Sequence, residues 1–188
     1  MKVLLILVMV IFSSITSYSQ DKITEDVRYT KEIKKLANKK EVKTAFQVIL
    51  DLEPKTIKNH IELTEIEAPP FKEEVRAIEF SKRLKDIEID KVWIDSIGNV
   101  LGLIKGYEGK RNVAIDGHLD TVFPEGTDVK VRIKNDTLFA PGIGDCTRCL
   151  SMLLTIAEAI KKSEIKTRDN ILIIGTVGEE GLGDLRGV

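Results

Sequence analysis

The sequence VAIDGHLDT at residues 113–121 carries the strongest indication of the fold, because an unbroken apolar run leads directly into a polar cluster. The run at 113–115 is typical of a strand buried on both faces of a sheet, and 171–177 predicts a second strand of this kind. Between them, 147–162 carries apolar residues at helical spacing. Strands that alternate with helices in this way indicate an α/β domain with a largely parallel mixed sheet flanked by helices.

The rest of the chain adds shorter elements to this framework. Apolar residues at helical spacing predict three more helices, at 44–52, 54–66 and 73–85. Short apolar runs beside turn residues predict four more strands, at 92–95, 99–105, 129–133 and 137–140. The last two flank Lys134-Asn135-Asp136, which is expected to be the turn of a hairpin.

The first 19 residues have the pattern of a signal peptide. Lys2 precedes the apolar run 3–12, which is too short to span a bilayer and has the length of a signal core. Ser17 and Ser19 place small residues at the −3 and −1 positions of a cleavage site. We therefore expect export to the periplasm or the medium, with a membrane anchor as the less favoured reading and no membrane association after cleavage.

The composition of the chain excludes some classes of function and indicates how the chain divides into domains. The 188 residues carry a formal net charge of −1, so no general affinity for nucleic acid or anionic lipid is implied. Residues 20–53 are expected to form an N-terminal helical extension, because 21–43 is rich in Lys and Glu and shows no chemistry. The α/β domain is expected to occupy 54–188.

Three polar clusters lie where an α/β sheet places its ligands, outside the carboxyl ends of strands. Residues 116–121 follow the strand at 113–115, and residues 178–181 follow the strand at 171–177. Residues 142–145 stand just before the helix that starts at Thr147. All three clusters contain glycine, which permits close backbone approach, so we expect them to open on one crevice.

The residue types in these clusters indicate a divalent metal, with zinc favoured over cobalt or manganese. His118 and Asp120 are two apart on an extended segment, so Asp120 is expected to hold the second imidazole nitrogen of His118. Asp145 could bridge two ions. Of the adjacent Glu179 and Glu180, one could bind metal while the other faces the substrate water. Each feature alone is more often a helix cap or a solvated loop, and their joint placement favours a site.

At these residues the chain resembles metallopeptidase family M20, which includes aminoacylase, succinyl-diaminopimelate desuccinylase, peptidase T and glutamate carboxypeptidase. The resemblance rests on 117–122, 141–145 and 175–180, and it runs from about Glu65 to Val188. Ala68-Pro69-Pro70 with Glu73-Glu74 also fits the first helix of that family. The resemblance implies a zinc-exopeptidase-like catalytic domain, of which 54–188 would be the N-terminal portion.

The resemblance also implies roles for five residues. His118 would ligate one metal ion, Asp120 would orient His118, and Asp145 would bridge both ions. Glu180 would ligate the second ion, and Glu179 would act as the general base. The implied enzyme is a two-zinc hydrolase of amide bonds in small peptides, a di- or tripeptidase or a related exopeptidase. The alternatives are an N-acyl amino acid deacylase or a carboxypeptidase of the same family.

The sequence departs from the family pattern at its C-terminal side. The family uses a further carboxylate ligand, a histidine ligand near its C-terminus, and a smaller lid or dimerisation domain, none of which is found in the eight residues after Glu180. We therefore expect an incomplete chain whose full-length form could be a homodimer, and we expect residues 20–188 alone to be inactive. A catalytically inactive truncated product is the non-enzymatic alternative. His60, the only other histidine, is expected on the surface of an early helix.

Cys146 and Cys149 are the only cysteines, and one close pair makes no disulfide framework. Many relatives in the family have glycine at the position of Cys149. The Cys-Thr-Arg-Cys spacing is redox-like, but no thioredoxin pattern accompanies it, so a thiol oxidoreductase is a remote reading. We expect structural or incidental cysteines that could compete for zinc.

Overall fold

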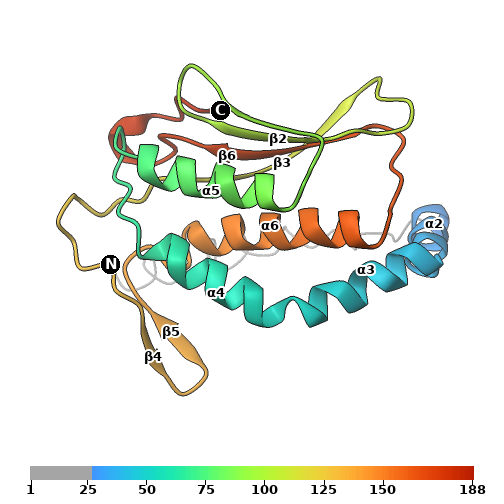
Figure 1. Cartoon of the computed structure of the whole chain (residues 1–188), viewed down its shortest axis with the longest axis horizontal. Coiled ribbons are helices and arrows are strands. Elements are labelled where there is room, and N and C mark those ends of the chain that lie inside the picture. The colour runs from blue at the N-terminus through green and yellow to red at the C-terminus, as the bar shows by residue number, and fades with distance from the viewer. Residues whose placement is uncertain (1–26) are drawn as a thin grey trace, which may run out of the picture. The chain divides into compact units, whose positions relative to one another are not determined.

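The computed structural model describes residues 27–188, which fall into two units divided after Ala37 (Figure 1). In the first unit the described part is helix α2 (Val27–Ala37), which has no buried residue. The second unit begins at Asn38 and contains all the other elements. The signal peptide and its cleavage site lie outside the described residues. Within 27–188, no helix combines the length and apolar character needed to cross a bilayer.

The centre of the second unit is a four-stranded mixed sheet with the order β1-β2-β6-β3. The strands are β1 (Lys91–Ile94), β2 (Val100–Ile104), β3 (Asn112–His118) and β6 (Asn170–Thr176). The predicted α/β class is confirmed, but the expectation of largely parallel pairing is wrong. Only β3 and β6 are parallel, whereas β1–β2 and β2–β6 are antiparallel. The short turn at 95–99 forces β1 and β2 to run in opposite directions, and only β3 and β6 have a helix between them as a crossover.

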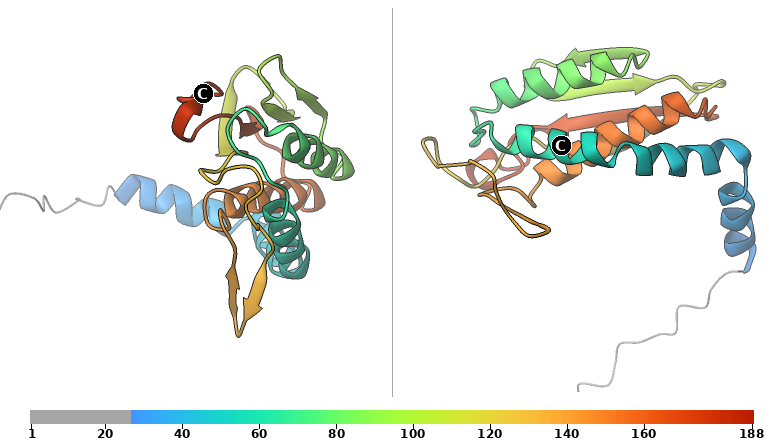
Figure 2. Two further views of the ribbon diagram at one scale, coloured as in Figure 1. Left: turned by 90° about the vertical axis from the view of Figure 1, so that its left-hand side faces the viewer. Right: turned by 60° about the horizontal axis from the view of Figure 1, so that its bottom comes forward.

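Helices α5 (Glu74–Asp86) and α6 (Thr147–Lys162) pack on the sheet, α5 against β1 and β2 and α6 against β3 and β6. Helices α3 (Lys40–Asp51) and α4 (Glu53–Thr64) follow one another along α6 (Figures 1 and 2). The apolar stripe predicted on 147–162 faces this interior. The fully buried side chains of the core include Leu63, Phe80, Leu84, Val100, Leu150 and Ile173. The site therefore rests on a packed α/β core.

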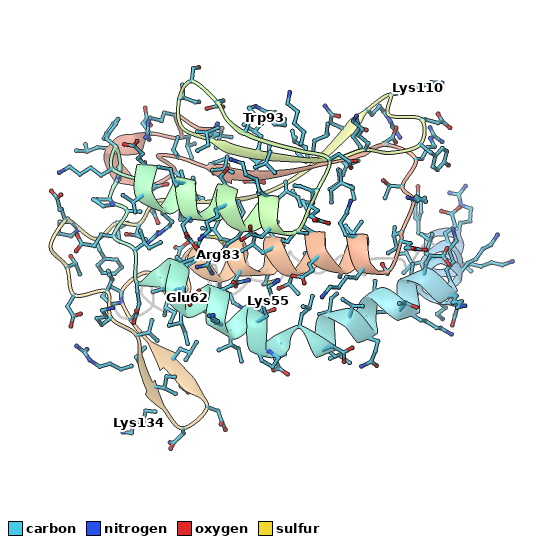
Figure 3. The ribbon with its side chains drawn as sticks, viewed as in Figure 1. Lys55, Glu62, Arg83, Trp93, Lys110 and Lys134 are labelled. Atoms are coloured by element: carbon cyan, nitrogen blue, oxygen red, sulfur yellow. A yellow bond between two sulfur atoms is a disulfide. The ribbon has the colours of Figure 1, made fainter. Side chains whose placement is uncertain are left out.

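Polar contacts join the helices at the edge of this core. Arg83 on α5 donates hydrogen bonds to Glu62 at 2.9 Å and to the Asn59 side chain at 2.7 Å, both on α4. Figure 3 shows Arg83 beside Glu62 and Lys55. Lys55 in turn donates to Glu158 on α6 at 2.7 Å. These contacts fix α4 against both helices that cover the sheet.

The predicted hairpin is confirmed, with strands shorter than expected, β4 (Arg132–Lys134) and β5 (Thr137–Phe139). Lys134 pairs with Thr137, so the turn is Asn135-Asp136. Asn135 has a φ of 53°, a left-handed conformation that asparagine tolerates better than most residues. The hairpin projects away from the sheet, with Lys134 near its tip (Figures 1 and 3).

Candidate metal centre

The parallel pairing of β3 and β6 brings two of the three polar clusters side by side. His118 lies opposite Thr176 in the register, so both strands end at the same edge of the sheet. The backbone N–H of Leu119 continues the pairing by donating to the Thr176 carbonyl at 2.6 Å. The residues that follow β3 therefore meet the residues that follow β6, as expected from the sequence.

His118 is held between Asp120 and Asp145, and its side chain is only 11% exposed. Its Nδ1 lies 3.0 Å from the backbone carbonyl oxygen of Asp120. Because a carbonyl oxygen only accepts, Nδ1 is the donor of this bond, and Nε2 is the nitrogen that faces the acidic cluster. Nε2 lies 2.9 Å from Asp145 Oδ1. The sequence predicted that the Asp120 carboxylate would hold His118, but its nearest oxygen is 3.8 Å from Nδ1, and the backbone carbonyl makes the contact instead.

The Asp120 carboxylate is completely buried and binds the backbone of the glutamate pair. Its Oδ1 accepts a hydrogen bond from the N–H of Glu179 at 3.0 Å, and its Oδ2 accepts one from the N–H of Glu180 at 2.8 Å. Charge-assisted bonds of this kind are stronger than neutral ones. Asp120 therefore fixes both His118, through its carbonyl, and the backbone of the two glutamates, through its side chain.

Arg76 on α5 supplies positive charge to this buried region, a residue that the sequence analysis did not single out. It is 1% exposed and donates to the carbonyl of Leu119 at 2.6 Å and to the carbonyl of Ile66. Burial lowers the pKa of Arg76 to about 10, and the negative charge of Asp120 opposes that shift. The sequence does contain a signal for the burial of Arg76, because this residue stands four positions before Phe80 on the buried stripe of α5.

The loop that carries Asp145 is anchored to two other segments. Gly142 has a φ of 72°, and a Cβ at this position would lie 2.8 Å from Thr121 Cγ2, so only glycine lets the loop approach the residues after β3. On the other side, His60 Nε2 lies 2.5 Å from the carbonyl oxygen of Ile143. Asp145 itself has a side chain that is 77% exposed. The loop thus presents an accessible carboxylate to the buried edge of His118.

His60 is buried at 7% exposure, so its predicted surface position is wrong. The reason is that α4 packs on α6, which places His60 beneath the loop that precedes α6. Burial lowers the pKa of His60; the hydrogen bond to Ile143 opposes this effect, and the charge of Arg148 adds to it. His60 supports the loop and does not belong to the acidic cluster.

The third cluster is fixed from the N-terminal end of α5. Glu73, buried at 3% exposure, accepts a hydrogen bond from the N–H of Gly178 at 3.1 Å. The same carboxylate accepts from the Arg186 guanidinium at 2.9 to 3.1 Å. Glu73, the first residue of the Glu73-Glu74 pair that fits the family's first helix, therefore anchors the backbone just before Glu179.

The potential ligand atoms of His118, Glu179 and Glu180 all lie within 4.8 Å of one another. A second group with the same spacing contains His118, Asp145 and Cys146, so His118 belongs to both groups. Burial raises the pKa of Glu180, the negative charges of Glu179 and Asp145 add to this shift, and His118 opposes it. A cation would relieve this crowding of negative charge. The mixed nitrogen and oxygen donors fit a divalent ion such as zinc.

The two cysteines form a disulfide at the start of α6, with 5.2 Å between their Cα atoms. Cys146 precedes the first residue of α6 and directly follows Asp145. Cys149 packs on β3, because a Cβ at Gly117 would lie 3.0 Å from the Cys149 Cβ. Gly117 is therefore needed where the disulfide meets the strand that leads to His118.

The parallel strand pair β3–β6 ends in clustered histidine and carboxylate groups, an arrangement of donors that suits a divalent metal ion. Residues 114–188 match the family model described as Peptidase family M20/M25/M40. Over these residues the chain is similar to this family, whose members are hydrolases, namely peptidases and amidohydrolases. The family resemblance inferred from the three motifs is thus confirmed.

Individual relatives agree with this assignment. A protein of Pyrococcus abyssi, named for LysW-lysine/LysW-ornithine hydrolase activity, is 35% identical over 120 residues, which are 64% of this chain and 32% of the relative. Human carnosine dipeptidase 1 is 16% identical with a TM-score of 0.64, over 76% of this chain and 36% of that one. A dinuclear metal binding peptidase of family M20 from Bacillus subtilis is 16% identical with a TM-score of 0.52, over 67% and 35%.

The chain spans about a third of the length of each of these relatives. At their low identities, the two solved structures establish a shared fold. The fold they share with this chain is that of family M20 catalytic domains, covered in part.

Proposed function

We propose that this chain provides the metal-binding and proton-transfer groups of a two-metal hydrolase that cleaves amide bonds in small peptides. The observation that carries the proposal is the position of His118, which has Asp145 on one side and the glutamate pair on the other, where β3 and β6 end. Similarity to the family supports hydrolysis, and the dipeptidase among the structural relatives favours small peptides.

In this proposal His118, Asp145 and Glu180 hold the ions, zinc in the first place and cobalt or manganese as alternatives. Bound divalent ions polarise the scissile carbonyl and lower the pKa of a bound water. The Nδ1 contact with the Asp120 carbonyl keeps His118 Nε2 directed at the cluster. The hydrogen bonds that the Asp120 carboxylate accepts from the backbone N–H groups of Glu179 and Glu180 fix where these two side chains begin. The protein thus orients its donors before any ion binds.

Glu179 is proposed as the general base. Its carboxylate takes a proton as the water oxygen attacks the carbonyl carbon, and it returns that proton to the leaving amine as the carbon–nitrogen bond breaks. The products are a carboxylic acid and an amine. Glu179 is exposed while its backbone is anchored by Asp120, a combination that suits a group exchanging protons with a substrate water.

A second candidate function is the release of an amino acid from an acyl partner, as in a deacylase or carboxypeptidase of the same family. The 35% identical relative favours it, because that protein is named as a hydrolase of LysW-lysine and LysW-ornithine. Export of the protein, from the pattern of residues 1–19, is a separate proposal and does not distinguish these substrates.

The proposed catalysis is tested by grafting residues 114–188 in place of the aligned segment of the Pyrococcus abyssi relative. We expect chelator-sensitive amide hydrolysis by the graft and a fall of about 100-fold or more in turnover for the graft carrying Glu179→Gln. Zinc binding by both grafts is measured as a control for folding. Full turnover by the Glu179→Gln graft would contradict the proposed base. A panel of dipeptides and N-acyl amino acids is then assayed with the graft and with the unaltered host. A change in substrate preference toward dipeptides favours the first function, and a change toward N-acyl amino acids favours the second.

A further inference from the structure

Cys146 occupies a position that the proposed mechanism does not use. It is buried at 7% exposure and lies directly after Asp145 in the chain. Its Sγ lies within 4.8 Å of ligand atoms of both His118 and Asp145. Its other neighbour is Cys149, three residues further on, to which it is bonded. One sulfur atom therefore stands within reach of the metal cluster and of a disulfide partner.

These two uses of the sulfur exclude each other. A sulfur in a disulfide carries no thiolate charge, whereas the thiolate is among the strongest protein ligands for zinc. A catalytic zinc commonly has three protein ligands, and on this side of the cluster His118 and Asp145 supply two. Cys146, once released from Cys149, would supply a third donor of a softer kind.

Contacts other than the disulfide also hold Cys146 in place. Cys146 is the residue that caps α6, and the N–H of Leu150 donates to its carbonyl at 3.1 Å. Cys149 lies in the first turn of α6 and packs on Gly117 of β3. Both cysteines are thus held by contacts other than their disulfide, so we expect the segment that carries Asp145 to keep its position when the bond between the sulfurs is broken.

We propose that Cys146 is a metal ligand whose availability is set by its disulfide with Cys149. This inference rests on the proposed metal site. In the oxidised protein the ion has His118 and Asp145 on this side; in the reduced protein it also has the Cys146 sulfur, and it is bound more tightly and with greater preference for soft ions. Reduction by a dithiol transfers two electrons and two protons to the two sulfurs, and the dithiol becomes a disulfide. The Cys146 thiol then gives up its proton to the solvent as it binds the ion.

The test is a cobalt titration of the full chain in its oxidised and reduced states, followed by absorption spectroscopy. A phosphine is the reductant, because it leaves no added thiol to bind cobalt; it takes an oxygen from water to become the phosphine oxide while the two cysteines gain hydrogen. We expect a thiolate-to-cobalt charge-transfer band in the near ultraviolet for the reduced protein and none for the oxidised protein. We also expect affinity for cobalt to rise by about tenfold or more on reduction, as for an added ligand.

Two matched variants assign the band to one sulfur. Cys149→Ser keeps Cys146 as a thiol, so the band should form without reductant. Cys146→Ser keeps Cys149 as a thiol, and it should show no band in either state. Far-ultraviolet circular dichroism checks that both variants fold. Either variant alone tests the proposal if the other one does not fold.

The outcomes separate this inference from the proposed function. Cobalt binding by the reduced protein with no thiolate band would overturn the role of Cys146 and leave the metal site standing. A band in Cys146→Ser would assign the sulfur ligand to Cys149 and would also overturn it. Absence of cobalt binding in every state and variant would refute the metal site, and the role of Cys146 with it.

Discussion

The buried carboxylate of Asp120 accepts a 2.8 Å hydrogen bond from the backbone N–H of Glu180. This contact connects the residues after β3 with those after β6, 60 positions later in the chain. Asp120 accepts a second bond from Glu179, and its carbonyl holds His118, so one residue organises both halves of the candidate centre.

Asp120→Asn should weaken both the fold and zinc binding. The amide group that replaces one carboxylate oxygen is a donor, so one backbone N–H of the glutamate pair loses its acceptor, and the negative charge near Arg76 disappears. We expect a loss of about 2–3 kcal/mol in the free energy of unfolding, measured by urea denaturation. We expect zinc affinity, measured by competition with a chromophoric chelator, to fall about 10–100-fold. Asp116→Asn, the same change at an exposed position of β3, should leave both quantities nearly unchanged.

Arg76→Met should destabilise the protein strongly although Arg76 has no proposed role in binding metal or substrate. The change removes the donors to the Leu119 and Ile66 carbonyls and leaves the buried charge of Asp120 without its compensating cation. We expect a loss of about 3–5 kcal/mol in urea denaturation, as for one partner removed from a buried charge pair. Arg132→Met alters a largely exposed arginine and should cost less than about 1 kcal/mol. Equal losses for the two variants would refute a structural role for Arg76.

His60 should make stability depend on pH. Its pKa is lowered from 6.5 in the folded protein, so the unfolded chain binds more protons at mildly acidic pH. The stabilisation is therefore fully present above pH 6.5 and is lost as the pH falls from 6.5 through the lowered pKa. Thermal denaturation of wild type and His60→Gln between neutral and mildly acidic pH measures the difference. We expect a shallower decline in the variant, and an unchanged decline would show that His60 does not titrate in this way.

Glu158 should stabilise the packing of α4 on α6. Burial raises its pKa, but hydrogen bonds from Lys162 and Lys55 outweigh burial, so its pKa in the folded protein is lowered from 4.5. Its contribution is thus present above pH 4.5 and is lost as the pH falls below that value. At neutral pH, Glu158→Gln should cost about 1 kcal/mol, because Lys55 is half exposed. Glu164→Gln, at an exposed position just past the end of the same helix, should cost less, and equal stability of the two variants would contradict this role for Glu158.

The strongly periodic parts of the fold could be predicted from the sequence. The helix at 147–162 was predicted with the bounds it has, because its apolar stripe is long and continuous. The pairing of β2 with β6 could not be predicted in the same way. The predicted burial of 113–115 on both faces is wrong, because β3 lies at the edge of the sheet and Val113 is 53% exposed. Local patterns indicate apolar segments, whereas the choice and direction of neighbouring strands depend on contacts between segments far apart in the chain.

The candidate site could also be predicted from the sequence only in part. Residue type and placement were enough to predict that these side chains meet, because parallel strands end at one edge and bring His118 beside Glu179 and Glu180, while Asp145 stands before the start of α6. The sequence did not show that the Asp120 carboxylate would turn away from His118 toward the glutamate backbone. The burial of His60 was also missed, because it depends on how α4 meets α6 rather than on the residues around His60.

If His118 is the shared ligand of a divalent metal centre, a zinc titration of wild type, His118→Asn and His60→Gln should show it. Chelator competition should show zinc binding by wild type, retained binding by His60→Gln, and affinity lower by about 100-fold or more for His118→Asn. Zinc binding by His118→Asn with the affinity of wild type would contradict the account.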